Sequence, residues 1–291
     1  MFTSTYEKPS HFILHFSDIH LVAGDELLYG DVDSEARIRQ LFLELEQSEA
    51  SPEAIIFTGD IADRGQAEAY QKIKAMIDPL ATKLGAEVIW LMGNHDDRAS
   101  FRQNLLGQES STEPVDEVHD INGLRIITLD TSVPGYHYGD LTAKQLDWLE
   151  EILKTKAPHG TLLAMHHPPI PSVQDLSVTT ELRNQKALAE IIKGSDIRSI
   201  IAGHLHYSSH STFAGIPVSV VSATCYTQDL NTKIGGIRGR DGAQAFNLVH
   251  VYDEIVLHSV VPIDIGKTVG EPFTPEQVKI ILSEKDVPKS Y

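Results

Sequence analysis

The sequence predicts an α/β protein, a four-layer αββα sandwich in which two mixed β-sheets pack together and helices cover both outer faces. Short apolar runs with the length of buried strands stand at 12–16, 54–58, 87–92, 161–165 and 198–202. Amphipathic segments lie between many of these runs, an order typical of parallel strands with helices outside. Hairpin-like stretches, which add antiparallel strands, stand at 118–130, 212–223 and 246–262.

The first helix is placed by apolar spacing of i, i+3, i+4 and i+7, which is carried by Ile38, Leu41, Phe42 and Leu45. Asp33 or Ser34 is suited to cap its N-terminus, so we expect the helix to begin there. Similar spacing indicates helices near 66–84, 97–106, 142–154 and 181–193. Among the hairpins, 118–130 is marked by an Asn-Gly turn signal between two extended arms.

We expect a single domain over residues 1–291, because no repeat or Pro/Gly/Ser-rich linker divides the chain. Residues 266–291 are expected to form a C-terminal tail with a short helix. Its start is marked by Thr274 as N-cap, Pro275 at the first helical position and Gln277 three residues after the cap.

The composition, with 41% apolar and 22% charged residues, is that of a folded globular protein and excludes disordered, collagen-like and coiled-coil chains. Asp and Glu outnumber Lys and Arg by 41 to 24, which gives a formal charge of −17 with neutral histidines. This excess argues against long nucleic acids and anionic membranes as partners. A small anionic molecule remains a possible partner where something local reverses the sign.

Cys225 is the only cysteine, so the chain can form neither an intrachain disulfide nor a thiolate metal cage, and a cytoplasmic location is expected. The N-terminus lacks the basic and apolar segments of a secretory signal. No apolar run approaches the roughly 20 residues that span a bilayer. We therefore expect a soluble protein without a membrane span.

Residues able to bind metal follow each of the five strand-like runs directly: Asp18-Ile19-His20, Gly59-Asp60, Gly93-Asn94-His95-Asp96, His166-His167 and Gly203-His204-Leu205-His206. Ligands of α/β sheets gather beyond the carboxyl ends of the strands, so we expect these loops to converge. Side chains two apart on an extended backbone point the same way, which pairs Asp18 with His20 and His204 with His206. The glycines before Asp60, Asn94 and His204 permit tight backbone turns.

Seven candidate ligands result: Asp18, His20, Asp60, Asn94, His166, His204 and His206. This is more than one metal ion needs. Mixed nitrogen and oxygen donors suit iron, manganese or zinc, whereas calcium and magnesium usually take oxygen alone. One carboxylate shared by two ions would hold them about 3.5–4 Å apart, the spacing used for in-line phosphoryl displacement by a bridging hydroxide.

The order D-x-H, G-D, G-N-H-D, H and G-H-x-H resembles the calcineurin-like metallophosphoesterase superfamily, and the matching blocks extend over about two thirds of the chain. The resemblance implies two ligand sets that share Asp60. The first set is Asp18, His20, Asp60 and His206, and the second is Asp60, Asn94, His166 and His204. It also implies that His95 is catalytic, since it contacts the phosphate and protonates the leaving alkoxide. The substrate phosphate is expected near His20, Asp60, Asn94, His95 and His206.

A finer resemblance is to the actinobacterial class III cyclic nucleotide phosphodiesterases, through the strings MGNHDDR, LDTSVPG, HPPIPS, GHLHYS, GIPVSV and SATCYTQD. It implies hydrolysis of 3′,5′-cyclic AMP to 5′-AMP, a homodimer and two ions of iron, manganese or zinc, a mixed iron/manganese pair included. One alternative is a broad phosphodiesterase acting on 2′,3′-cyclic nucleotides, glycerophosphodiesters or aryl phosphodiesters, or else a phosphomonoesterase. A remote alternative is a non-catalytic metal-binding scaffold.

Several residues near the motifs have expected roles other than metal binding. We expect His167 to support a ligand or the fold, and Asp96 to orient a histidine or cap the next helix. Asp63 either forms hydrogen bonds near the site or shapes a turn. Cys225 is expected to be a small buried apolar residue. The aromatic run 136–138 is a wall for a base, a dimer contact or an ordinary packed loop.

Overall fold

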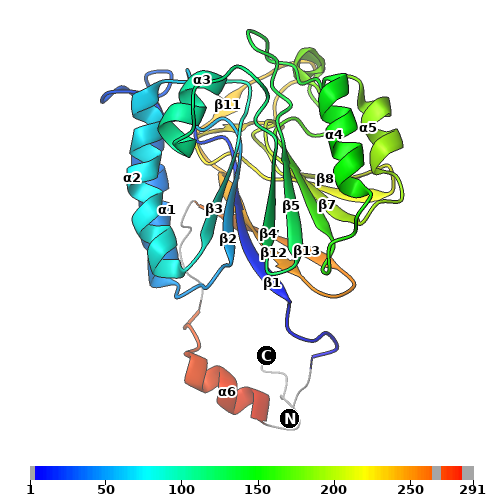
Figure 1. Ribbon diagram of the computed structural model, residues 1–291. Helices are drawn as coiled ribbons and strands as arrows, with labels where there is room; N and C mark the ends of the chain where they lie inside the picture. The colour runs from blue at the N-terminus through cyan, green and yellow to red at the C-terminus, as the bar shows by residue number, and fades with distance from the viewer. Residues whose placement is uncertain (1–3, 264–269, 284–291) are drawn as a thin grey trace.

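The computed structural model describes residues 4–263 and 270–283 and has the predicted arrangement of two mixed sheets between helices (Figure 1). The first sheet has the order β13-β12-β1-β2-β3. Its strands are β1 (His11–Phe16), β2 (Ala54–Thr58), β3 (Glu87–Leu91), β12 (Ala245–Val251) and β13 (Val256–Pro262). β1, β2 and β3 are parallel, whereas β12 and β13 are antiparallel to their neighbours.

The second sheet has the order β4-β5-β6-β7-β9-β8. Its strands are β4 (Glu117–Ile121), β5 (Leu124–Leu129), β6 (Thr161–Met165), β7 (Ile197–Ala202), β8 (Ser209–Phe213) and β9 (Ile216–Val220). β5, β6, β7 and β9 are parallel, and the edge strands β4 and β8 are antiparallel. A small ribbon joins β10 (Thr227–Gln228) to β11 (Gly239–Arg240). The hairpins predicted at 118–130, 212–223 and 246–262 are confirmed.

The helices lie on the outer faces. α1 (Ser34–Gln47), α2 (Ala67–Leu84) and α3 (Arg98–Phe101) lie on the side of the first sheet, and a π-helical segment, Arg102–Leu106, continues α3. α4 (Ala143–Leu153) and α5 (Gln185–Ile192) cover the second sheet, with a 3₁₀ segment, Asp175–Thr180, before α5. As predicted, Asp33 caps α1, because its side chain accepts a hydrogen bond from Ala36 N.

Three apolar cores separate the four layers. On β1, Leu14 and Phe16 pack toward α1 and α2, whereas Ile13 belongs to the core between the sheets. A third core joins the second sheet to α4 and α5. Strands such as β2 are buried along their whole length because both faces are covered, which explains their continuous apolar sequence.

The helix predicted over 181–193 begins later than expected, at Gln185. Residues 181–183 are instead drawn into an extended pairing with Gly139, where Gly139 N donates to Glu181 O and Arg183 N donates to Gly139 O. This long-range pairing overrides the local helical spacing.

The helix predicted in the C-terminal tail is α6 (Pro275–Ser283). The expected cap is present, because Gln277 N donates to Thr274 Oγ1 and Thr274 N donates to Gln277 Oε1. The rest of the predicted tail at 266–269 and 284–291 lies outside the described residues, and the single domain over 1–291 stays a prediction. None of the described helices combines the length and apolar character needed to cross a membrane.

A buried acidic network fastens the loop after β5. Asp130 Oδ2 accepts a hydrogen bond from Arg98 Nε at 2.9 Å, and Arg98 also donates to Ser132 O. Asp116 Oδ1 accepts from Asp130 N at 2.8 Å and from Gln145 Nε2 at 3.0 Å. Burial raises the pKa of Asp116 to about 6, although these hydrogen bonds favour its ionised form.

This raised pKa predicts that Asp116→Asn stabilises the protein at neutral pH. Protonated Asp116 makes its full contribution to the free energy of unfolding below the pKa that this carboxyl has in the unfolded chain. That contribution is lost as pH rises through the folded-state pKa of about 6. Wild type therefore carries a penalty at pH 7.5 that the amide avoids, at most roughly 3 kcal/mol for two pKa units. Urea unfolding at pH 4 and pH 7.5 should show the variant gaining on wild type at the higher pH only.

Asp147→Asn is the matched control, because this exposed aspartate on α4 loses the same charge outside the network. Its difference from wild type should not grow between the two pH values. A pH-independent difference for Asp116→Asn would contradict the raised pKa.

Candidate metal centre

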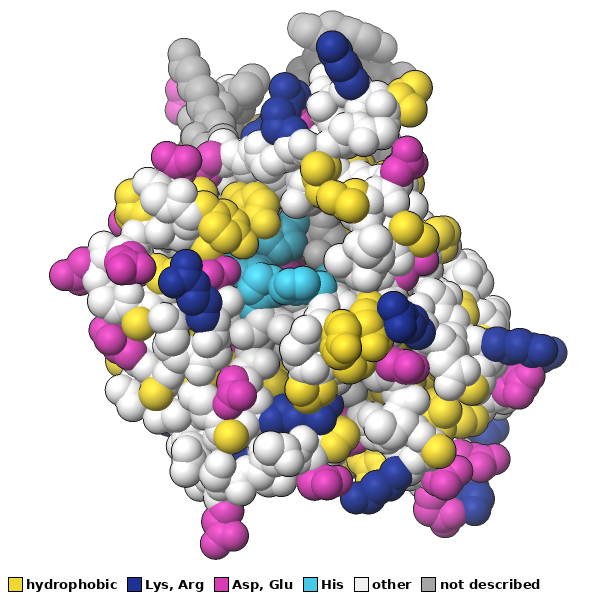
Figure 2. All heavy atoms as spheres, turned by 90° about the horizontal axis from the view of Figure 1, so that it is seen from above, with side chains coloured by type: hydrophobic (Ala, Val, Ile, Leu, Met, Phe, Trp, Pro, Cys, Tyr) yellow, Lys and Arg dark blue, Asp and Glu magenta, His cyan; other side chains and the backbone are white. Residues whose placement is uncertain are grey.

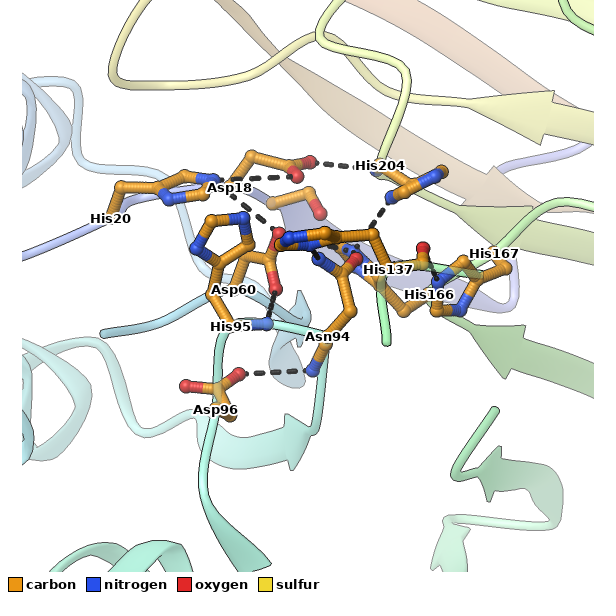
Figure 3. Close-up of polar contacts among 12 residues, drawn as sticks. Asp18, His20, Asp60, Asn94, His95, Asp96, His137, His166, His167 and His204 are labelled. Carbon is orange, nitrogen blue, oxygen red and sulfur yellow. Dashed lines mark hydrogen bonds and ion pairs between the residues drawn. The ribbon is translucent and has the colours of Figure 1, made fainter. Parts of the chain in front are cut away.

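The predicted ligands lie together at the ends of strands from both sheets (Figure 3). Asp18 and His20 follow β1, Asp60 follows β2, and Asn94 and His95 follow β3. From the second sheet, His166 follows β6, and His204 and His206 follow β7. Figure 2 looks onto this end of the molecule and shows histidines in a central hollow with apolar side chains beside them. The site is therefore assembled across the sandwich.

One half of the cluster is formed by His20, His206 and Asp18. His20 Nε2 lies 3.2 Å from His206 Nε2, and His206 Nε2 lies 3.3 Å from Asp18 Oδ1. Asp60 Oδ2 lies 3.4 Å from His20 Nε2. Two ligand atoms that each lie about 2.1 Å from one ion are spaced roughly 3–3.5 Å apart. These four side chains thus have the spacing of ligands to one ion.

The other half is formed by His166, His204 and Asn94. His166 Nε2 lies 3.2 Å from His204 Nδ1 and 3.2 Å from Asn94 Oδ1. Asp60 Oδ2 is also 3.2 Å from His166 Nε2. The same carboxylate oxygen therefore lies within 3.4 Å of a histidine from each half.

Each of the four histidines turns one nitrogen inward and bonds the other to an oxygen. His20 Nδ1 bonds to Asp63 Oδ1 at 3.2 Å, and His166 Nδ1 bonds to Thr58 O at 2.7 Å. His206 Nδ1 bonds to Tyr226 O at 2.9 Å, and His204 Nε2 bonds to Thr180 O at 3.0 Å. Because oxygen acceptors hold a proton on the outer nitrogen, a neutral ring presents its lone pair to the centre, the arrangement of metal-binding histidines.

Asp18 and Asp60 likewise use one carboxylate oxygen for a backbone hydrogen bond and turn the other toward the cluster. Asp18 Oδ2 accepts from His204 N at 2.9 Å, and Asp60 Oδ1 accepts from His95 N at 2.8 Å. The remaining oxygens face the cluster, and Asp18 Oδ1 has no well-directed hydrogen-bond donor among the described residues. Asp18 is fully buried and Asp60 is 2% exposed. Buried carboxylates of this kind need cations, so the donor set fits metal ions.

The pKa values of the histidines also reflect the need of the buried carboxylates for positive charge. Burial disfavours a proton on His20, but Asp60, Asp63 and Asp18 outweigh it and raise its pKa to about 10. For His166 burial is likewise opposed, chiefly by Asp60, and the pKa is raised to about 9. Burial by itself would raise the pKa of the two carboxyl groups. The neighbouring His206 nevertheless holds the pKa of Asp18 below the usual range, and His166 does the same for Asp60. Without metal, imidazolium rings supply the positive charge.

The backbone at the site is strained, which overturns the expected extended geometry. Left-handed φ values occur at five candidate ligands: Asp18 (53°), His20 (48°), Asp60 (51°), His204 (71°) and His206 (56°). The pairs predicted to share a face do reach one cluster, but through left-handed turns rather than extended strands. Such conformations are disfavoured for residues with a Cβ and cluster at functional sites.

The glycines before the motifs serve two different needs. Gly59 has φ of 100° and permits a tight turn, as predicted. At Gly93 and Gly203 the reason is close approach. A Cβ at Gly93 would lie 2.1 Å from Asp60 Oδ1, and one at Gly203 would lie 1.8 Å from Ser17 Oγ. These positions leave no room for a side chain beside the carboxylates.

His95 lies beside the first half of the cluster, with its ring centroid 4.6 Å from that of His20. Its Nδ1 donates to Asp63 O at 2.8 Å, which directs Nε2 away from that carbonyl. Burial is the largest influence on the pKa of His95 and lowers it, with Asp60 acting in the opposite direction. Asp63 thus contacts both His20 and His95, which resolves its expected role in favour of hydrogen bonding near the site.

His137 is a site residue that motif spacing missed. Asn94 Nδ2 donates to His137 Nδ1 at 3.0 Å, which fixes Asn94 with its Oδ1 toward His166. His167 supports this loop, because its Nε2 bonds to His137 O and its Nδ1 bonds to Thr131 Oγ1. The aromatic run 136–138 was the only sequence signal for this position.

Asp96 plays a different part from the two we expected. Its carboxylate accepts from Ile61 N, Ala62 N and Gly93 N, and from the Tyr70 hydroxyl. It therefore ties the loop after β2 to the loop after β3. The cap of α3 is the next residue, Asp97, whose side chain accepts from Ser100 N. Cys225 is buried, as expected, with Sγ 3.9 Å from His206 Nδ1.

Comparison with known proteins identifies the family of the chain. The family model for calcineurin-like phosphoesterases matches residues 13–208. A Rhodococcus erythropolis protein named probable cyclic nucleotide phosphodiesterase is 54% identical, over 97% of each chain. A Mycobacterium tuberculosis protein named cAMP/cGMP dual specificity phosphodiesterase is 55% identical, over 97% of this chain and 89% of its own.

A crystal structure of a dimetal phosphatase from Danio rerio shares the fold. Its TM-score is 0.55 at 14% identity, covering 86% of this chain and 99% of that one. The family match spans every candidate ligand and more than half of the residues. The chain therefore belongs to the calcineurin-like phosphoesterase family.

Proposed function

We propose that the protein is a metal-dependent phosphodiesterase that hydrolyses 3′,5′-cyclic nucleotides, with cyclic AMP converted to 5′-AMP. The observation that carries the proposal is the set of four histidines whose outer nitrogens bond to oxygens. Their inner nitrogens meet in one cluster, in which Asp60 contacts His20 and His166 and Asp18 contacts His206. The relatives named as cyclic nucleotide phosphodiesterases support the choice of substrate. A homodimer and a cytoplasmic location stay predictions.

In this proposal Asp18, His20, Asp60 and His206 hold one ion, and Asp60, Asn94, His166 and His204 hold the other. The mixed donors suit iron, manganese or zinc. Such ions, when bound, neutralise the phosphate and lower the pKa of the attacking water. The phosphate would contact His20, Asp60, Asn94, His95 and His206, and its charge would then be tolerated in an acidic protein.

His95 is the proposed proton donor to the leaving O3′. The Asp63 carbonyl holds the Nδ1 proton, so a protonated ring can donate only through Nε2. Burial lowers the pKa of His95, which makes its imidazolium a stronger acid. The ring is 23% exposed on its side chain, and a substrate can therefore reach it.

Rates on a panel of phosphate esters test the proposed substrate. We expect kcat/KM for 3′,5′-cyclic AMP to exceed that for 2′,3′-cyclic AMP, glycerophosphoethanolamine and p-nitrophenyl phosphate by at least about tenfold. Metal content should be measured on the same sample. Near-equal values of kcat/KM would indicate a broad phosphodiesterase. The highest kcat/KM on p-nitrophenyl phosphate would indicate a phosphomonoesterase, and the absence of turnover on every substrate would indicate a binding scaffold.

Metal binding should release protons, because His20 and His166 are protonated at pH 7 in the metal-free protein. Their raised pKa values, about 10 and 9, mean that protons compete with metal below those values, so affinity should rise from pH 7 to pH 9. Calorimetry with Mn²⁺ at pH 7 in buffers of different ionisation enthalpy should detect about two protons released on filling the centre. Binding without proton release would contradict the protonated state.

Asp60→Asn should lower the metal content from two ions per chain to about one, because the shared anionic oxygen is lost. Elemental analysis after metal loading measures this content. Asp78→Asn is the matched control, an exposed change on α2 at a residue paired with Lys74. Two ions retained by Asp60→Asn would refute the bridging role.

His95→Ala should reduce kcat for cyclic AMP by about 10²–10⁴-fold, as is typical for loss of a general acid. The loss should be far smaller with bis(p-nitrophenyl) phosphate, because p-nitrophenolate leaves without a proton. His210→Ala, at an exposed position on β8, controls for loss of a histidine elsewhere. Equal losses on the two substrates would contradict proton donation.

A further inference from the structure

Two tyrosines extend the site outward from its first half. The Tyr226 ring packs on the His206 ring with centroids 4.5 Å apart. The Tyr29 ring then contacts Tyr226 edge to face, with centroids 5.7 Å apart and planes at 71°. Tyr29 is 61% exposed, so much of its ring is available to a ligand. The rings of Tyr226 and Tyr29 thus form a continuous aromatic surface between the candidate ligand His206 and solvent.

Local packing fixes Tyr29 in this position. The preceding residue, Leu28, is buried in a small core with Val32, Ala223 and Cys225. Backbone hydrogen bonds between Leu28 and Val32 close the turn. Tyr29 itself has φ of 53°, a disfavoured conformation that this turn maintains. An exposed aromatic ring is therefore held in a strained, defined position.

The residue before Tyr226, Cys225, is fixed by backbone contacts to the site on one side and to α1 on the other. Cys225 N donates to Asp18 O, and Arg37 and Gln244 both donate to Cys225 O. Asp241 in turn accepts from Gln244 and pairs with Arg37 at 2.6 Å. The two rings are consequently placed relative to Asp18 and His206 before any ligand arrives.

The opposite side of the site is less suited to stacking, although the sequence suggested 136–138 as a wall for a base. The Arg183 guanidinium lies 3.3 Å from the Tyr138 ring centroid, and Tyr136 packs against Tyr138 at 5.0 Å. His137 is engaged by Asn94. Tyr138 and His137 therefore already have partners from outside their own loop. The Tyr29 ring contacts another ring only through Tyr226 among the described residues.

We propose that Tyr29 and Tyr226 form the wall on which the base of a nucleotide stacks while its phosphate lies at the histidine cluster. The inference rests on the proposed function and refines it, because a glycerophosphodiester has no ring to stack. Exposed acidic residues of the same loop, Asp25, Glu26 and Asp31, favour a neutral base over a second anionic group. Stacking on an aromatic side chain contributes about 1–3 kcal/mol per base.

Calorimetry on the metal-loaded, full-length protein tests the wall with 5′-AMP and with ribose 5-phosphate, which carries a hydroxyl where 5′-AMP carries the base. Wild type should bind 5′-AMP about 5- to 150-fold more tightly. Tyr29→Ala should lose most of this preference through weaker 5′-AMP binding, with ribose 5-phosphate within about twofold of wild type. Tyr29→Phe keeps the ring and should keep the preference.

Tyr136→Ala is the control, an exposed tyrosine from the opposite loop. It should retain the preference for 5′-AMP. The proposal would be overturned if Tyr29→Ala kept the preference, if Tyr136→Ala removed it, or if wild type had none. Failure to hydrolyse cyclic AMP would overturn the proposed function instead, since the binding ratio does not depend on turnover.

Discussion

The burial of Asp18 and Asp60 is the constraint on which the rest of the structure depends. Their carboxylates are withdrawn from water, and an ionised group there is stable only beside opposite charge and hydrogen-bond donors. One oxygen of each accepts a backbone N–H, and the other is left to the centre. Protonated His20 and His166 satisfy that charge in the metal-free protein, and the same inward atoms are placed to bind cations.

This arrangement imposes a cost on the backbone. Left-handed conformations at the five strained ligands cost about 1 kcal/mol each, so their sum is comparable with the net stability of an ordinary domain. The surrounding cores must hold these turns, which explains why the ligands follow fully buried strands such as β2 and β6. Cations bound between the carboxylates would offset part of this strain and the charge repulsion together.

The candidate ligands could be brought together from the sequence because each follows an apolar run that marks its own strand, and because their short motifs are local in sequence. The contacts that orient them could not. Thr58, Thr180 and Tyr226 act through backbone carbonyls, which leave no side-chain signature. His137 reaches Asn94 across 43 positions, with no motif linking the two. The late start of α5 has the same origin, because pairing with the distant Gly139 overrides local spacing.

The formal charge of −17 describes the whole chain and does not describe the charge at the candidate site. Under the proposed function, Asp18 and Asp60 would hold positive charge at the centre and would attract a phosphate only through the cations beside them. Asp25, Glu26 and Asp31, on the loop that carries Tyr29, are exposed carboxylates outside the histidine cluster and disfavour a second anionic group. A ligand with one phosphate and a neutral ring satisfies both regions, whereas a polynucleotide would bring further phosphates against the acidic loop. The charge distribution is therefore consistent with the proposed small-molecule substrate.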